Sequence, residues 1–263
     1  MGCSVCANVC PTKALTMVPQ EQEAGQQKAF DYMVANVSVK EDVADLTVKG
    51  SQFKQPLLEF SGSCAGCAET AYARLITQLF GDRMYISNAT GCSSIWGGPA
   101  ATSPYTTTAE GKGPAWANSL FEDNAEHGLG LYLGQKAIRN RLAAKTEALI
   151  AVPHAYPGLK EAAQKWLDTM EDGTANQEAT KQYIAALEDC LMTVDGCLAF
   201  VNSDEGKAKF GDQAAGFKAH MEELKAAGET YCDCDACKLA REILQEKEYL
   251  NKKSVWIFGG DGW

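Results

Sequence analysis

Residues 57–87 read LLEFSGSCAGCAETAYARLITQLFGDRMYIS, and this stretch decides the fold that the sequence predicts. The apolar run LLEF predicts a strand, and Ser61 to Ser63 predict a turn and the cap of a helix. Apolar residues recur at helical spacing from Ala71 to Leu79, and Gly81 is expected to end that helix. MYIS predicts a second strand. A strand, a helix and a strand in succession indicate an α/β fold with a parallel-type sheet.

Cysteines lie where these predicted strands end. Cys64 and Cys67 come between the first strand and the helix, and Cys92 lies in the small-residue loop after MYIS. Ligands of open α/β sheets gather at the carboxyl ends of strands, and a helix N-terminus favours bound negative charge. A C-x2-C pair alone is shared by zinc ribbons, redox dithiols and iron-sulfur clusters. Together with Cys92 it provides three thiolates on two loops, and a metal site there needs a fourth ligand.

The final residues, KKSVWIFGGDGW, combine a predicted buried strand at 255–258 with a glycine turn around Asp261. Glycines let a backbone approach a charged ligand closely while a carboxylate points towards it. The end of this strand is therefore a candidate binding turn.

The first cysteines of the chain have the spacing of an iron-sulfur motif. GCSVCANVCPTKAL contains C-x2-C-x3-C-P, the later part of the bacterial run that holds [4Fe-4S] clusters. Cys3 and Cys6 are expected to serve one cluster and Cys10 another, since the last cysteine of the run serves the second cluster in two-cluster ferredoxins. TKAL predicts a return strand, and a zinc knuckle or chance spacing is the alternative interpretation. Residues 18–56 are polar and predict a connection, with one or two strands in VANVSV and DLTV.

Composition limits the function classes. The chain has 263 residues, of which 46% are hydrophobic, and a formal net charge of -10. The negative charge disfavours nucleic acid and anionic membrane surfaces as partners. An apolar run long enough to span a bilayer and the apolar core of a signal peptide are both missing, so we expect a cytoplasmic protein. The eleven cysteines favour thiolates that bind metal over a secreted disulfide framework.

The remaining cysteines and the histidines carry weaker signals. Cys232, Cys234 and Cys237 resemble metal ligands, yet the sequence after them begins a helix, so we expect no metal there and keep adventitious zinc as the alternative. Cys190 and Cys197 are expected to be core thiols. The three histidines show no ligand spacing. Residues 158–250 contain amphipathic stretches and predict a helical insertion between strands.

Three stretches together resemble one family. The segments 60–98, 111–130 and 252–263 are similar to the thiamine diphosphate domain of pyruvate:ferredoxin (flavodoxin) oxidoreductases, and residues 2–15 resemble the end of the family's two-cluster ferredoxin domain. The resemblance implies a ferredoxin-like α+β remnant and linker at 1–50, followed by a partial thiamine diphosphate-binding domain at 51–263. It further implies that the chain is an internal fragment of such an enzyme.

The resemblance also implies roles for individual residues. Cys64, Cys67 and Cys92 match three ligands of the [4Fe-4S] cluster closest to the thiamine, and the family's fourth ligand would lie beyond Trp263. Asp261 matches the Mg2+ ligand of the thiamine diphosphate motif, which suits a cation that prefers oxygen ligands. The turn lining the diphosphate corresponds to Gly260, Gly262 and Trp263, and Glu69 and Cys92 match positions that touch the cofactor.

The implied function is oxidative decarboxylation of pyruvate to acetyl-CoA and CO2. Electrons would pass through the clusters to ferredoxin or flavodoxin in a homodimeric, anaerobic enzyme, with coenzyme A and pyruvate bound largely by domains outside this chain. The chain alone is expected to be inactive. Two alternatives are a stand-alone iron-sulfur electron carrier and a zinc-stabilised binding module.

Overall fold

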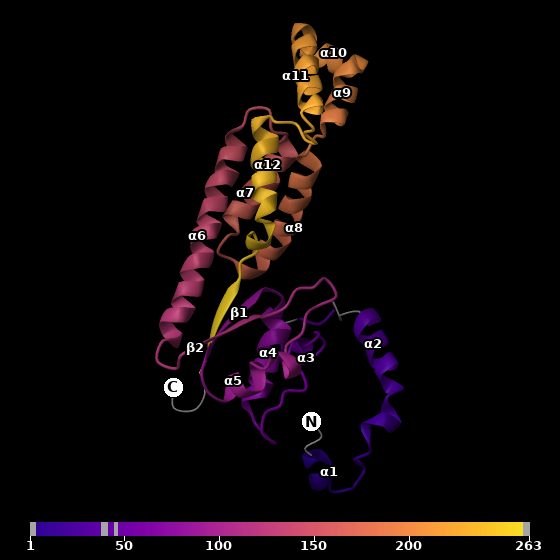
Figure 1. Cartoon of the computed structure of the whole chain (residues 1–263), viewed down its shortest axis with the longest axis vertical. Coiled ribbons are helices and arrows are strands. Elements are labelled where there is room, and N and C mark those ends of the chain that lie inside the picture. Colours follow the sequence, from indigo (N-terminus) through magenta and orange to yellow (C-terminus); the bar gives the residue numbers. More distant parts are fainter. Residues whose placement is uncertain (1–3, 38–41, 45–46, 260–263) are drawn as a thin grey trace. The chain divides into compact units, whose positions relative to one another are not determined.

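The structure is a computed structural model that describes residues 4–37, 42–44 and 47–259. The chain forms two compact units: unit 1 comprises Met1–Leu133 with Lys253–Trp263, and unit 2 comprises Gly134–Lys252. Figure 1 shows the parallel strands of unit 1 and the helices of unit 2. Each unit is described by itself.

A three-stranded parallel sheet organises unit 1. Its strands are β1 (Met84–Ala89), β2 (Ala115–Ser119) and β3 (Ser254–Phe258), in the order β2-β1-β3. In the central strand, Ile86 and Ala89 are fully buried, as expected where a parallel sheet is covered on both faces. The α/β prediction with a parallel sheet is therefore confirmed, including the strands expected at MYIS and at 255–258.

The helices of unit 1 either precede β1 in the chain or lie between its strands. They are α1 (Val5–Val9), η1 (Gln20–Glu23), α2 (Gln26–Asn36), α3 (Val48–Ser51), α4 (Glu69–Phe80), η2 (Gly81–Arg83), α5 (Cys92–Gly97), η3 (Ala100–Thr102) and the beginning of α6 (Asn124–Ala151).

The strand predicted at LLEF is wrong. Leu58 forms only an isolated antiparallel bridge with Tyr105, and the segment does not join the sheet. Two features explain this. Phe60 adopts a positive φ of 57°, which ends the extended conformation. The backbone N–H of Leu57 donates to the hydroxyl of Thr77 on α4 instead of to a strand partner (3.1 Å).

The helix predicted from the spacing of Ala71 to Leu79, with its end at Gly81, is confirmed as α4, but its predicted cap is wrong. Ala68 occupies the cap position without a side-chain hydrogen bond. Ser61 and Ser63 instead hydrogen-bond to each other (3.1 Å), because the turn that contains the two cysteines separates them from the helix.

Residues 4–37 differ from the expected pattern of strands. TKAL forms no strand among the described residues, since Lys13 has a positive φ of 51°. The predicted connection instead contains α2, whose glutamine-rich sequence favours helix and includes an i,i+4 bond from Gln27 to Asp31 (2.7 Å). The strands predicted in VANVSV and DLTV fall partly outside the described residues, and the parts that are described lie in or beside α2 and α3.

Unit 2 is helical, as the amphipathic pattern of residues 158–250 predicts. It contains the rest of α6 together with α7 (Pro157–Asp168), α8 (Gly173–Cys190), α9 (Val194–Asn202), α10 (Asp204–Phe210), η4 (Gly211–Gln213), α11 (Ala214–Ala226), α12 (Asp235–Gln245) and η5 (Lys247–Tyr249).

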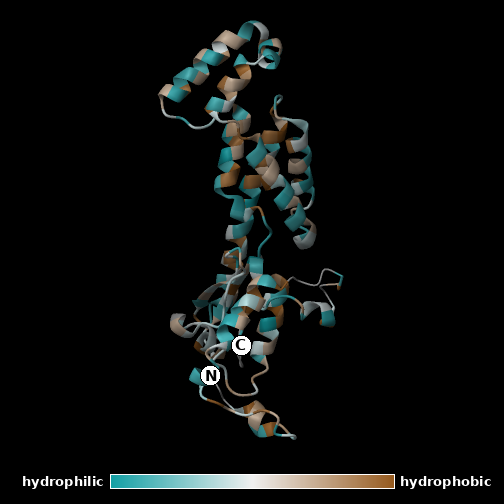
Figure 2. Ribbon diagram, turned by 90° about the vertical axis from the view of Figure 1, so that its right-hand side faces the viewer, coloured by the Kyte–Doolittle hydropathy of each residue, from teal (hydrophilic) through white to brown (hydrophobic). Residues whose placement is uncertain are grey.

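Two hydrophobic clusters stabilise this unit. The larger one joins α6, α7, α8 and α12 through residues such as Leu142, Trp166, Tyr183 and Ile243, which are all fully buried. The smaller cluster lies among α9, α11 and the segment before α12. Hydrophobic and hydrophilic residues mix along these helices, as Figure 2 shows. Among the described helices, none combines the length and the apolar character needed to cross a bilayer.

Candidate functional site at the carboxyl edge of the sheet

The carboxyl ends of the three parallel strands share one edge of the sheet, which we call the strand edge. Cys92 begins α5 two residues after Thr90, the first residue beyond β1, and Asn124 begins α6 after β2. Gly259 is the last described residue after β3. Parallel topology therefore brings together loops that are far apart in the sequence, which is how open α/β sheets build ligand sites.

A polar network centred on Asn124 connects the three strands at this edge. The Asn124 side chain is fully buried and accepts hydrogen bonds from Ser87 of β1 (2.6 Å) and Ser119 of β2 (2.9 Å). It donates to the carbonyl of Phe258 at the end of β3 (3.1 Å). Nδ1 of His127 lies 2.7 Å from Oγ of Ser87. This network holds the strand ends in fixed register, since each buried polar group has a partner.

Two buried polar atoms at the same edge have no protein partner in the described structure. They are Oδ1 of Asn88 and Oγ of Ser93, and both residues are fully buried. Ser93 directly follows Cys92 in α5. Buried polar atoms are normally hydrogen-bonded, so unpaired ones beside a loop of thiols suit a bound polar group or ordered water.

Cys64 and Cys67 lie on a tight turn just before α4. The backbone N–H of Cys67 donates to the carbonyl of Cys64 (3.1 Å), and Gly66 has a φ of +76°. A positive φ at the third position is the mark of a type II turn and favours glycine there. The Cys64 side chain is exposed and Cys67 is partly buried, so both thiols are accessible to a ligand.

A hydrogen bond joins the helices that follow these cysteines. Oε2 of Glu69, in the first turn of α4, accepts from Nε1 of Trp96 on α5 (3.2 Å). Trp96 also packs with Leu58 and Ala73 in a small hydrophobic cluster. Burial, together with the Glu69 charge, raises the pKa of Tyr105 well above its usual range. The first turn of α4 and the helix carrying Cys92 are therefore neighbours.

The N-terminal thiols lie around α1. Cys6 is within this helix, and Cys10 follows it. Two hydrogen bonds lower the pKa of the exposed Cys10 thiol to about 7. The larger effect comes from the Thr12 hydroxyl and the smaller from the backbone N–H of Ala14. A thiolate is the form that ligates metal, so these contacts favour ligation.

Some predicted ligands cannot be placed. Cys3, Gly260, Asp261, Gly262 and Trp263 lie outside the described residues. Convergence of Cys64, Cys67 and Cys92 on one cluster stays a prediction, as do the roles of Cys6, Cys10 and Glu69.

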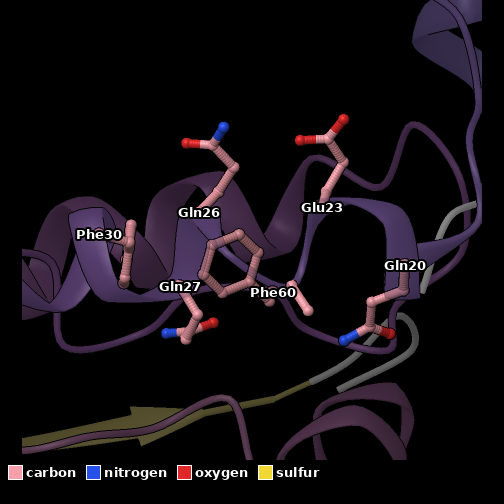
Figure 3. A pocket seen from close by; sticks show the side chains of 7 residues that line it. Gln20, Glu23, Gln26, Gln27, Phe30 and Phe60 are labelled. Atoms are coloured by element: carbon pink, nitrogen blue, oxygen red, sulfur yellow. The ribbon is translucent and has the colours of Figure 1, made fainter.

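A shallow pocket lies where η1 and α2 face Phe60 (Figure 3). The rings of Phe30 and Phe60 meet edge to face, with centroids 6.3 Å apart. The rest of the lining consists of glutamines, one alanine and Glu23. The lining offers neither a set of metal ligands nor basic side chains that would bind a diphosphate. We therefore place the candidate site at the strand edge.

Residues of the strand-edge network were missed by sequence reasoning. Asn124 and His127 lie within the stretch GKGPAWANSLFEDNAEHGLG, which carried part of the resemblance, but nothing in their spacing marks them as partners of Ser87. The expectation of no metal near Cys237 stays a prediction, although the thiols of Cys232, Cys234 and Cys237 gather within 4.8 Å of one another and could hold an ion.

A parallel sheet with Cys92 and buried polar groups at its carboxyl edge has the arrangement in which open α/β folds build ligand sites. The whole chain is 42% identical to the pyruvate-flavodoxin oxidoreductase of Klebsiella pneumoniae and 43% identical to the pyruvate:ferredoxin oxidoreductase of Moorella thermoacetica, covering 19% of each. It is 45% identical to the mitochondrial pyruvate dehydrogenase [NADP(+)] of Euglena gracilis, covering 12% of that protein. No family model matches the chain.

These relatives confirm the resemblance seen in the sequence. The similarity extends over the full chain, which spans about a fifth of the length of the first two relatives.

Proposed function

We propose that this chain is part of an oxidoreductase that oxidatively decarboxylates pyruvate to acetyl-CoA and CO2. The enzyme uses thiamine diphosphate with Mg2+ and passes electrons through [4Fe-4S] clusters to ferredoxin or flavodoxin. The observation that carries the proposal is the full-length similarity to proteins named for pyruvate oxidation with flavodoxin or ferredoxin.

The exposure of three thiols, those of Cys64, Cys67 and Cys92, is suited to an iron-sulfur cluster. Cys64 and Cys92 are exposed and Cys67 is half-buried, so their sulfurs are open to a ligand. The bond between Glu69 and Trp96 fixes the first turn of α4 against α5, which limits the movement of both cysteine loops. In this proposal Cys64, Cys67 and Cys92 hold one cluster, and its fourth ligand comes from a part of the enzyme beyond this chain.

The thiamine site is proposed at the end of β3. Asp261 holds Mg2+, while Gly260, Gly262 and Trp263 line the diphosphate, and Glu69 and Cys92 lie beside the cofactor. When bound, thiamine diphosphate supplies the electron sink for decarboxylation and the cluster supplies a one-electron acceptor. The unpaired Oδ1 of Asn88 and Oγ of Ser93 support a polar ligand at this edge.

The chain's own residues position this site. Asn124 ties the end of β3 to β1 and β2, so the turn that follows Phe258 starts from a fixed point. His127 and Ser87 share a hydrogen bond (2.7 Å) that can hold a proton between them at the strand edge. Preorganised polar groups of this kind avoid the reorganisation that water would require.

The N-terminal segment is proposed as a remnant of the electron relay. Cys3 and Cys6 serve one [4Fe-4S] cluster and Cys10 serves another, with further ligands outside the chain. The lowered pKa of Cys10 supports ligation there. In this scheme residues 1–50 belong to the ferredoxin-like domain and residues 51–263 to the thiamine domain of a cytoplasmic homodimer.

The test is an activity measurement on the complete reading frame that contains this chain, expressed and purified without oxygen. We expect reduction of a viologen dye that depends on both pyruvate and coenzyme A. Replacement Cys92→Ser should abolish it, whereas Cys197→Ser, in the helical unit, should retain it. The 263-residue chain alone should show no activity. Dye reduction with another 2-oxoacid but not with pyruvate would overturn the proposal. Dye reduction that persists in the Cys92→Ser enzyme would also overturn it.

A further inference from the structure

Five of the eleven cysteines gather in unit 2, far from the strand edge in sequence. They are Cys190, Cys197, Cys232, Cys234 and Cys237. The sulfurs of Cys232, Cys234 and Cys237 all lie within 4.8 Å of one another. Such a concentration of thiols needs an explanation, because cysteines placed only for packing have no reason to direct their sulfurs to one point.

The backbone builds this arrangement from two distant segments. Thr193 and Tyr231 form an isolated antiparallel bridge, and the N–H of Cys232 donates to the carbonyl of Met192 (2.9 Å). Cys234 then takes the cap position of α12, which places Cys237 in the first turn of that helix. The N–H of Cys234 points to the sulfur of Cys232 (3.4 Å). Backbone N–H groups aimed at sulfur are typical supports of a thiolate.

Cys190 offers a fourth thiol next to these three. It is the last residue of α8, two positions before the paired segment. The Cys237 sulfur lies 3.7 Å from the Cys190 carbonyl oxygen, which places Cys190 beside the grouped thiols. Cys197, on α9, lies instead beside Cys232 and contributes to the small hydrophobic cluster.

The thiols lie at the neck of a small helical lobe formed by α9, α10 and α11, residues 194–226. The neck is the place where this lobe joins the end of α8 and the start of α12. In Figure 1 the lobe follows the end of α8 and leads back into α12. Its buried cluster consists of Val194 and Met221 with three cysteines, Cys197, Cys232 and Cys237. So small an apolar core is a weak source of stability, and small units of this kind commonly depend on a metal.

We propose that Cys190, Cys232, Cys234 and Cys237 bind one structural zinc ion as a tetrathiolate site that fastens this lobe to the helices of unit 2. Cys232 and Cys237 are 5% and 3% exposed, so the ion is shielded from solvent, as in closed structural sites. Since all four ligands are protein thiolates, no position remains open for a substrate, and the role is structural.

The distances favour a single ion over a cluster. A tetrahedral zinc with Zn–S bonds of about 2.3 Å holds its sulfurs roughly 4 Å apart. The thiolates around a [4Fe-4S] cube are roughly 6–7 Å apart, because each binds a different iron. Three sulfurs within 4.8 Å of one another match the first geometry. Four thiolates in a tetrahedral arrangement are a usual ligand set of structural zinc.

A neighbouring contact fixes the loop that carries the ligands. Nε2 of His220 on α11 lies 2.9 Å from Oδ1 of Asp233, the residue between Cys232 and Cys234. This contact holds the Cys232–Cys234 segment against the lobe.

The experiment measures zinc in the purified 263-residue chain after desalting, by elemental analysis, in four versions: wild type, Cys234→Ser, Cys190→Ser and Cys197→Ser. We expect one zinc per wild-type chain and per Cys197→Ser chain, and a loss of that zinc in the other two. Cys197 is the matched control because it is buried in the same neck without being a ligand. Cobalt added to the zinc-free chain should show the intense absorption of a tetrathiolate.

A second measurement does not depend on any substitution. Removal of zinc from the wild-type chain by a chelator should increase amide hydrogen exchange in α9, α10 and α11 while α7 and α8 change little. Zinc content that is equal in Cys234→Ser and wild type would reveal adventitious metal and overturn the site. Loss of zinc in Cys197→Ser with retention in Cys190→Ser would overturn the ligand set, and unchanged exchange after chelation would overturn the structural role. None of these results depends on pyruvate oxidation.

Discussion

Replacing the buried Arg139 by methionine tests how unit 2 is held together. Its guanidinium donates to the carbonyls of Leu250 (2.6 Å) and Met170 (2.7 Å), and it lies over the Trp166 ring, 5.7 Å from the centroid. The Leu250 carbonyl also accepts from Trp166 Nε1 (3.0 Å). Arg139 therefore ties α6 to the end of α7 and to the segment that leads into β3.

The size of the effect follows from these contacts. Two hydrogen bonds from a charged donor contribute about 3–6 kcal/mol together, and the cost of burying the cation offsets part of this. That cost is visible in the lowered pKa of Arg139, which burial causes. The Leu250 carbonyl keeps other donors after the replacement, so it is not left unpaired. We expect Arg139→Met to lower the free energy of unfolding by about 2–4 kcal/mol.

Arg141 provides a matched control on the same helix. It forms a two-pronged pair with Glu246 (2.7 and 2.9 Å), but its side chain is 55% exposed. Exposed pairs contribute about 0–1 kcal/mol, so Arg141→Met should have little effect. Urea unfolding followed by far-ultraviolet circular dichroism measures both. Equal destabilisation by the two replacements would refute the reasoning that buried carbonyl contacts hold this unit.

Three further predictions concern other parts of the chain. Gly206→Ala should destabilise the α9–α11 lobe by about 1–3 kcal/mol, seen as faster hydrogen exchange there, because a Cβ would collide with the α9 backbone; unchanged exchange would contradict this. Asn124→Ala should cost about 1–3 kcal/mol by leaving strand-end groups such as the Phe258 carbonyl unpaired, and an unchanged unfolding midpoint would refute it. Thr12→Val should raise the pKa of Cys10 above about 7, so iodoacetamide alkylation, which needs the thiolate, should require higher pH; an unshifted profile would show that the hydroxyl contact has no effect.

Local patterns in the sequence predicted two strands of the described sheet, β1 and β3, and its main helix, but not β2. The β-branched and aromatic runs at MYIS and VWIF became β1 and β3, and the helical spacing before Gly81 became α4. These elements were predictable because their apolar periodicity and glycine ends are encoded within a few residues.

Features that depend on long-range contacts were not predictable in this way. LLEF was expected as a strand, but Thr77 of α4 takes the backbone N–H of Leu57. The helix α2 was overlooked because its polar composition suggested a connection, although glutamine favours helix. Cys190 and Cys237 meet only because a bridge between two distant segments brings them together. Pairing of this kind leaves no local signal in the sequence.

In the proposed function, Cys64, Cys67 and Cys92 hold an iron-sulfur cluster at the carboxyl edge of the sheet. The most direct test is an anomalous difference map at the iron absorption edge, from crystals of the complete enzyme grown without oxygen. We predict a compact iron peak in contact with all three sulfurs, with Asp261 facing the same cavity. Metal-free sulfurs at these three positions in a map that shows iron elsewhere in the crystal, or Cys92 on the opposite edge of the sheet from Cys64, would contradict it.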